Sequence, residues 1–408
     1  MTDLASATVA VADRVSRIQP SPSTAASARA KELRNAGRDI LDLTVGEPDV
    51  DTPDHVKQAA IQAIQDGQTK YTPVNGTPAL RRAVAARYLT RDQVTYTDAE
   101  ITVGGGAKQV IFMALTATVD DGAEVIVPAP YWVSYPDMVR VNGGTPVVVP
   151  CAEDDDFKLT PAALAAAITD RTRWVILNAP GNPTGSAYTA DELRALADVL
   201  VRHPEVLVLV DEIYDEIWYH PEPISNLLTV EPGLRPRVLT VNGVSKTYAM
   251  TGWRLGYGVG PAWLITAINT LQSHSSSCPS SISQAAAVAA LTGPSEFVHR
   301  MVETYRRRRD LVVTLLSDAP RLRCGTVPQG AFYLWINCQD AIGATTPDGQ
   351  VLQTDAQVVL YLLEHAGVAS IHGGAYGSSP YFRISFAASE ETLEQACRRI
   401  WKAFAELC

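Results

Sequence analysis

The stretch TVNGVSKTYAMTGWRLGYGVGP, residues 240–261, decides the fold prediction because it places a polar turn between two apolar strands. We predict strands at residues 238–241 and 256–260, since both are short runs bounded by turn-forming residues. Lys246 follows the first of these strands, directly after Ser245. A lysine in this position is usually a surface residue, so its meaning depends on what the rest of the chain brings to the same edge of the sheet.

The chain that precedes this stretch alternates between apolar strands and helices. A helix near Lys108 follows three consecutive glycines, and another begins at Thr189, where Glu192 completes a capping box. Such alternation predicts an α/β fold with a mostly parallel sheet and right-handed crossovers. The further strands are expected at residues 100–103, 124–127, 146–149, 172–177 and 206–210.

The two ends of the chain predict a second, smaller unit. Its elements are a helix at 25–35, a strand at 40–43, an arginine-rich helix at 303–317, strands at 332–336 and 381–386, and a final helix at 391–407. The first twenty or so residues have the composition of a loose arm. We therefore expect a flexible arm at 1–20, a large domain at 50–305, and a small α+β domain formed by 21–49 and 306–408.

Composition excludes several functional classes. The 408 residues are 46% hydrophobic and 19% charged, which is typical of a globular protein with a sizeable core. The net charge is −10 without any basic run, which argues against nucleic-acid binding. No apolar run approaches the roughly 20 residues that span a bilayer. The six cysteines show no CxxC spacing and no neighbouring histidine cluster, so we expect free thiols and no metal site. The N-terminal segment does not have the pattern of a signal peptide, so we expect a cytoplasmic protein.

Polar and aromatic residues follow one predicted strand after another. Trp132, Asn182, Asp211 and Lys246 each come shortly after a strand, and the triple glycine lies between a strand and a helix. Ligands of open α/β sheets bind at the carboxyl ends of the strands. Each residue alone has an ordinary explanation: a tight turn, a helix cap, a core aromatic.

Together, these residues match the needs of pyridoxal 5′-phosphate (PLP). This cofactor requires a lysine for an imine, a carboxylate at its pyridine nitrogen and a donor at its phenolate oxygen. It also requires cations and N–H groups at its phosphate, which a glycine turn at a helix N-terminus can supply, and an aromatic face against its ring. The sequence therefore predicts a PLP site at this edge.

At this point the chain resembles the fold type I, class I aminotransferases, in the branch of bacterial aspartate and plant-type prephenate aminotransferases. The resemblance runs from about residue 19 to the C-terminus. It implies a large domain with a mixed, mostly parallel seven-stranded sheet covered by helices on both faces, plus a smaller α+β domain. The motifs that carry it are VGEPDVDTP (45–53), KYTPVNGTPALR (70–81), PAPYWVSYPDM (128–138), NAPGNPTG (178–185), VDEIYDEIWY (210–219), the opening stretch, PQGAFYLW (328–335) and FRISFA (382–387).

The resemblance implies a role in cofactor binding for each matched residue. Lys246 would form the Schiff base and then carry a proton between Cα and C4′, and Asp211 would pair with the pyridinium nitrogen. Tyr214 and Asn182 would hydrogen-bond the phenolate oxygen, and Trp132 would stack on the ring. The implied phosphate site consists of Gly106, Ala107, Lys108, Ser245 and Arg254.

The resemblance also implies an assembly and a substrate clamp. Tyr71 would reach the phosphate in a neighbouring subunit, which makes a homodimer the expected state. Arg383 would bind the substrate α-carboxylate, helped by the backbone of Gly46 and by Asn182, with Trp132 also touching the substrate.

The function implied is an aminotransferase that moves an amino group between an acidic or aromatic amino acid and a 2-oxo acid by a ping-pong mechanism. The alternative is a PLP-dependent lyase, replacement or carbon–carbon bond-forming enzyme on the same fold. Departures from the family pattern keep that alternative open, namely His274 and Cys278 in residues 273–281 and His372 in residues 370–377. Lys108 could instead recognise a distal carboxylate, and the substrate-proximal hydroxyl of the N-terminal segment could belong to Ser23 or Thr24.

Overall fold

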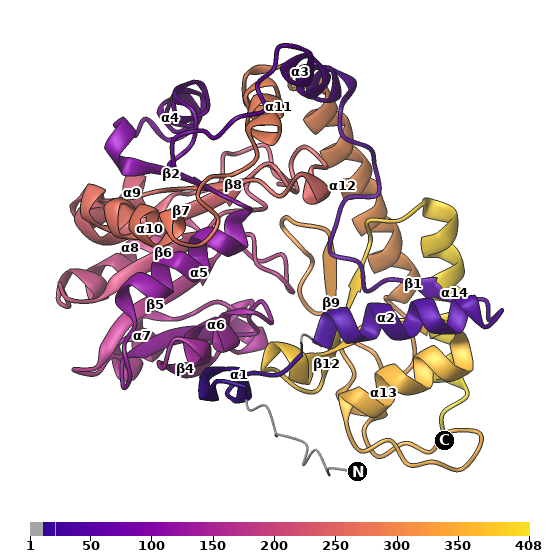
Figure 1. The fold of residues 1–408 in the computed structure, drawn as a ribbon. Helices are drawn as coiled ribbons and strands as arrows, with labels where there is room; N and C mark the ends of the chain where they lie inside the picture. The colour runs from indigo at the N-terminus through magenta and orange to yellow at the C-terminus, as the bar shows by residue number, and fades with distance from the viewer. Residues whose placement is uncertain (1–10, 21) are drawn as a thin grey trace, which may run out of the picture.

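The computed structural model describes residues 11–20 and 22–408 and has two parts of unequal size. Figure 1 shows the large sheet and its helices on one side, with β1, β9, β12, α2, α13 and α14 beside them. From α2 onward the chain passes through the smaller part, crosses to the larger part and returns, so N-terminal and C-terminal segments lie together in the smaller part.

The larger part is built on a seven-stranded sheet in the order β2-β8-β7-β6-β5-β3-β4. Strand β8 runs antiparallel to both of its neighbours, and the other pairs are parallel. The mixed, mostly parallel seven-stranded sheet is thus confirmed. The strands are β2 (Ile101–Gly104), β3 (Glu124–Ala129), β4 (Thr145–Pro150), β5 (Thr172–Asn178), β6 (Leu207–Asp211), β7 (Val238–Gly243) and β8 (Gly256–Val259).

Helices cover both faces of this sheet, which explains why its central strands are continuously apolar. On one face Ile111, Leu264 and Ile268 pack against Trp174 and Leu209 of the sheet. The helices on that face are α5 (Ala107–Thr118), α6 (Tyr135–Val141) and α10 (Ala262–Ser273). The helices of the opposite core are α3 (Asp54–Gln65), α4 (Pro78–Asp92), α7 (Pro161–Ala167), α8 (Ala190–Val201), α9 (Leu227–Val230) and α11 (Ser281–Thr292).

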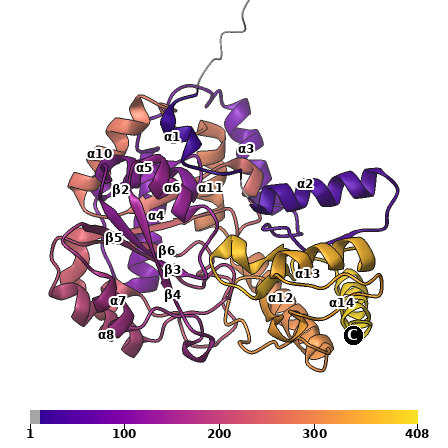
Figure 2. The same cartoon turned by 90° about the horizontal axis from the view of Figure 1, so that it is seen from below.

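The smaller part has its own apolar core around an antiparallel sheet in the order β11-β12-β9. Its strands are β9 (Tyr333–Asn337), β11 (Ile371–His372) and β12 (Tyr381–Ser385). Strand β1 (Leu41–Asp42) pairs in parallel with β10 (Val368–Ala369), which joins the N-terminal segment to the C-terminal one. The helices are α2 (Pro22–Asn35), α12 (Glu296–Leu316), α13 (Asp355–Tyr361) and α14 (Glu390–Ala405). Figure 2 shows these four helices grouped to one side of the large sheet. The exact domain boundaries stay a prediction.

The remaining elements are short 3₁₀ and π segments. The 3₁₀ turns are η1 (Asp98–Glu100), η2 (Glu153–Asp155), η3 (Pro232–Arg237), η4 (Thr251–Trp253), η5 (Gln339–Ala341) and η7 (Gly373–Tyr376), and η6 (Leu362–Ala366) is a π turn. Among the described residues, no helix combines the length and apolarity needed to cross a membrane.

The flexibility of the arm at 1–20 stays a prediction. Within its described residues, α1 (Asp13–Ser16) has no buried residue but contacts α6, and Arg17 lies 3.7 Å from Asp121. Residues 1–10 lie outside the described part. The arginine-rich helix starts earlier than predicted, at Glu296, because Val298 and Met301 continue its buried face toward the N-terminus.

Candidate active site

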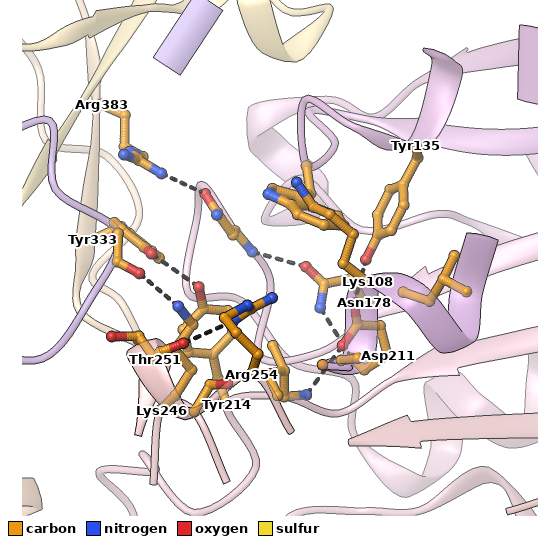
Figure 3. Close-up of a pocket in the computed structure, with 18 of the residues that line it drawn as sticks. Lys108, Tyr135, Asn178, Asp211, Tyr214, Lys246, Thr251, Arg254, Tyr333 and Arg383 are labelled. Carbon is orange, nitrogen blue, oxygen red and sulfur yellow. Dashed lines mark hydrogen bonds between the residues drawn. The ribbon is translucent and has the colours of Figure 1, made fainter. Parts of the chain in front are cut away.

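A cavity of about 450 Å³ opens at the carboxyl ends of β5, β6 and β7, where the two parts of the protein meet. Parallel pairing sets Asn178 opposite Asp211, and Asp211 opposite Val241, so neighbouring strands end at one edge. Figure 3 shows Arg383 and Tyr333 on one side of the cavity, with Asp211, Lys108 and Tyr135 on the other. Chain segments far apart in sequence therefore supply one site.

Asp211 is a buried carboxylate at the end of β6, only 4% exposed. The hydroxyl of Tyr135 donates to its Oδ2 at 2.7 Å, and the backbone N–H of Ile213 donates to its Oδ1 at 3.1 Å. Burial raises the pKa of Asp211 to about 6 in spite of these donors. Among the described residues no cation forms an ion pair with Asp211. This carboxylate is therefore suited to pair with a positively charged atom of a ligand.

Lys246 lies on the turn after β7, and its Nζ donates to the carbonyl oxygen of Gly46 at 2.6 Å. Burial lowers the pKa of Lys246 to about 8, against the opposing charge of Glu47, and Arg254 lowers it further. An amine with this pKa is partly neutral near physiological pH, which both imine formation and proton transfer require.

A site for an anion lies at the N-terminus of α5. Gly106 precedes this helix at φ 105°, a backbone conformation that favours glycine, and a Cβ there would lie 2.7 Å from Nη2 of Arg254. Lys108 lies 4.6 Å from the centre of the Trp132 ring, and burial lowers the pKa of its amine. Open backbone N–H groups and two cations match a phosphate group.

Arg383 reaches the cavity from β12 and is 3% exposed. Its guanidinium donates to Oδ1 of Asn182 at 2.9 Å and to the carbonyl oxygen of Thr44 at 2.6 Å. Asn182 is held in turn by Asn178, whose Oδ1 accepts its backbone N–H at 2.9 Å. Because both acceptors are neutral, the arginine keeps a charge that a carboxylate ligand can neutralise.

Nearly all the predicted site residues line this one cavity. They are Gly46, Gly106, Ala107, Lys108, Trp132, Asn182, Asp211, Tyr214, Ser245, Lys246, Arg254 and Arg383. Tyr71 does not line it and is 92% exposed. Sequence reasoning missed other lining residues, namely Ser27, Thr44, Ile111, Tyr135, Asn178, Ile213, Thr251 and Tyr333. Of these, Tyr135 and Asn178 follow predicted strands, and this position in the sequence could have identified them as site residues.

The residues that departed from the family pattern lie elsewhere. His274 is the C-cap of α10, and the Sγ of Cys278 accepts the backbone N–H of Thr72 at 3.4 Å. His372 lies 3.9 Å from Asp355. None of the three lines the cavity, so they give no support to the lyase alternative. The side chains of Ser23 and Thr24 lie outside the described residues.

The fold and the cavity define a class of protein: a fold type I enzyme whose site suits a phosphorylated cofactor with a carbonyl group for Lys246 and a basic nitrogen for Asp211. The family model for aminotransferase class I and II matches residues 38–400. The chain belongs to this family and is a PLP-dependent aminotransferase.

Individual relatives are similar over nearly the whole chain. A probable aspartate/prephenate aminotransferase of Rhizobium leguminosarum bv. phaseoli is 50% identical over 390 residues, which cover 96% of this chain and 97% of the relative. An aspartate/prephenate aminotransferase of Cereibacter sphaeroides is 49% identical with the same coverage. The crystal structure of the aspartate aminotransferase from Rhizobium meliloti superposes with a TM-score of 0.95 at 49% identity, covering 98% of this chain and 100% of the other.

Proposed function

We propose that this aminotransferase moves the amino group of an acidic amino acid to a 2-oxo acid, in the manner of an aspartate/prephenate aminotransferase. The observation that carries the proposal is the meeting of Lys246, Asp211 and Arg383 in one cavity, each hydrogen-bonded to neutral groups and without an ion-pair partner among the described residues. The names of the relatives supply the substrate class.

The cavity fits PLP at each of its functional groups. The N-terminus of α5, Arg254 and Ser245 would bind the phosphate, and Trp132 would cover the ring. Asp211, whose pKa burial already raises to about 6, would share a proton with the pyridine nitrogen. Bound PLP supplies an electron sink for the pair of electrons left when the substrate Cα loses its proton.

The remaining work falls to side chains of the chain itself. Arg383 would bind the substrate α-carboxylate and hold Cα near Lys246. Lys246, with a pKa of about 8, can accept a proton from Cα and return it to C4′. The distal carboxylate of an acidic substrate would meet Lys108, which lines the cavity and whose ammonium has no carboxylate partner among the described residues.

The assembly and the cellular location belong to the same proposal. Tyr71 is exposed and outside the cavity of its own chain, as expected if it completes the phosphate site of a second subunit in a homodimer. The six cysteines are free thiols, which suits a reducing compartment such as the cytoplasm.

The amino donor can be identified from the visible absorbance of PLP linked to lysine. Purified protein reconstituted with PLP is mixed separately with aspartate, glutamate, phenylalanine, tyrosine and alanine, and loss of the band is followed. We expect the fastest loss with aspartate or glutamate, and recovery of the band on adding prephenate or 2-oxoglutarate. If no amino acid removes the band, the enzyme is not a transaminase for these donors. Lys246→Ala is the control that should lack the band.

A further inference from the structure

Tyr333 lies in the cavity between Tyr214 and Arg383 and contacts both. It lies on β9, is fully buried and places its hydroxyl 2.8 Å from that of Tyr214. Its ring lies 4.2 Å from the guanidinium carbon of Arg383. A Cβ at Gly46 would lie only 3.2 Å from the Tyr333 hydroxyl, so the glycine leaves the space that this hydroxyl occupies. Figure 3 shows the contact between the two hydroxyls as a dashed line.

Either tyrosine can be the donor in the hydrogen bond between the two hydroxyls, and the choice decides whether Tyr214 can donate to a ligand in the cavity. Each hydroxyl has one proton, and neither makes another hydrogen bond among the described residues. If Tyr214 donates to Tyr333, it has no proton left for the cavity. If Tyr333 donates, the proton of Tyr214 is available to an anionic oxygen in the cavity.

The surrounding charges favour Tyr333 as the donor. Burial raises the pKa of Tyr333, but the neighbouring Arg383 guanidinium opposes that rise. Burial and Tyr333 hold the pKa of Tyr214 well above the usual range; Arg383 opposes this rise too, but the carboxylate of Asp211 adds to it. The guanidinium of Arg383 lies over the ring of Tyr333, 4.2 Å from its centre, and no cation lies over the ring of Tyr214 among the described residues. A cation over the ring makes the hydroxyl of Tyr333 the better donor, so the proton between the two oxygens is assigned to Tyr333.

We propose that Tyr333 is a positioning residue that donates its hydroxyl proton to Tyr214 and thereby directs the proton of Tyr214 toward the phenolate oxygen of PLP. This inference rests on the proposed placement of PLP. A hydroxyl that already accepts a hydrogen bond is a stronger donor, because successive hydrogen bonds polarise one another. The small domain, which carries Tyr333, thus acts on the cofactor that the large domain holds.

The test is a spectrophotometric pH titration of the PLP–lysine band in the holoenzyme of Tyr333→Phe. A donor at the phenolate oxygen stabilises the form in which the imine nitrogen has lost its proton, and so lowers the pKa of that nitrogen. Weakening the donor should therefore raise this pKa, by roughly 0.3 pH unit if cooperative strengthening is a fifth or so of one charged hydrogen bond. A fall in this pKa, or no change, overturns the proposal, since a fall means that Tyr214 was donating to Tyr333.

Tyr376→Phe is the matched control. The ring of Tyr376 also faces Arg383, at 5.4 Å, and its buried hydroxyl has no hydrogen-bond partner among the described residues. Removing it should leave the imine pKa unchanged, and an equal rise in both variants would overturn the proposal. Succinate affinity, read from its effect on the band, should be unchanged in Tyr333→Phe because the ring beside Arg383 remains. A joint loss of succinate affinity would assign a general structural role to Tyr333. Absence of the band in the wild type would contradict the placement of PLP instead.

Discussion

Two groups of buried charges lie on either side of the end of β6. The charges of one group contact only neutral groups, whereas those of the other group form ion pairs with each other. One group faces the cavity and includes Asp211, Lys246 and Arg383. The other, here called the ion cluster, faces α4 and consists of Arg87, Arg91, Asp92, Glu212 and Asp215. Adjacent residues, Asp211 and Glu212, therefore belong to different groups, as expected from the alternation of side chains along a strand.

In the ion cluster every charge has a partner. Arg87 and Arg91 both bind Asp215, and Arg91 also binds Glu212 at 2.6 Å and Asp92 at 2.5 Å. Asn242 donates to Asp215, and Asn226 donates to Glu212, both at 2.8 Å. Such mutual compensation is what buried charges need in order to remain in a folded protein.

In the cavity, the charges contact only neutral groups. Asp211 accepts from a hydroxyl and an amide, Lys246 donates to a carbonyl, and Arg383 donates to an amide and a carbonyl. The comparison indicates that charges paired within the protein support the fold, whereas unpaired buried charges are kept for the charges of ligands.

The largest effect on stability is expected from Asp215→Asn. It removes the negative charge between two buried arginines, and breaking one side of a buried ion network costs about 3–5 kcal/mol. Urea unfolding of the PLP-free protein should show this loss, while the holoenzyme keeps the wild-type pH dependence of the PLP–lysine band. Unchanged stability would show that the ion cluster is not structural.

Asp211→Asn should have the opposite effect: it should impair activity without lowering stability. Without the carboxylate the pyridine nitrogen loses its proton partner, so transamination should fall by about 10²- to 10³-fold, as when one preorganised electrostatic group is removed. The PLP-free protein should unfold at the same or a higher urea concentration, because a poorly compensated buried charge is gone. Activity within a few-fold of wild type would contradict the role of Asp211.

Arg383→Lys tests whether the unpaired cation of the cavity binds the substrate carboxylate. Lysine cannot reproduce a fork that contacts Asn182 and Thr44 together. The loss of one charged hydrogen bond predicts a decrease in kcat/KM of roughly 10- to 100-fold, mostly through KM. Steady-state kinetics and succinate binding should change together. An unchanged KM with a reduced kcat would place Arg383 outside substrate binding.

The smallest effect is a pH dependence of stability due to Asp211. The folded pKa of about 6 lies above the ordinary value near 3.9, so between these values the folded protein keeps a proton that the unfolded chain has lost. The contribution of Asp211 to stability therefore falls as pH rises through this window. The stability gained by Asp211→Asn, without PLP, should be larger at about pH 7 than at about pH 4.5. Equal gains at both pH values would contradict the raised pKa.

The sequence indicated the cavity residues that follow strands of the large sheet better than those that the smaller part contributes. Asp211 and Lys246 follow neighbouring strands of one sheet, and parallel pairing alone brings them together. Tyr333 and Thr44 enter through the pairing of β9 with β12 and of β1 with β10, which joins segments far apart in the chain. Apolar periodicity carries no signal for such contacts. The ion cluster had a local signal, since Arg87 and Arg91 are four residues apart and share one face of α4.

The most direct test of the central claim is to locate the covalent attachment of PLP. The holoenzyme is reduced with borohydride, digested and analysed by mass spectrometry. The account predicts that the pyridoxyl phosphate mass is found on Lys246 and on no other lysine, with Asp215→Asn labelled like the wild type. Label on Lys108 or another lysine, or a cofactor that remains dialysable after reduction, would contradict it.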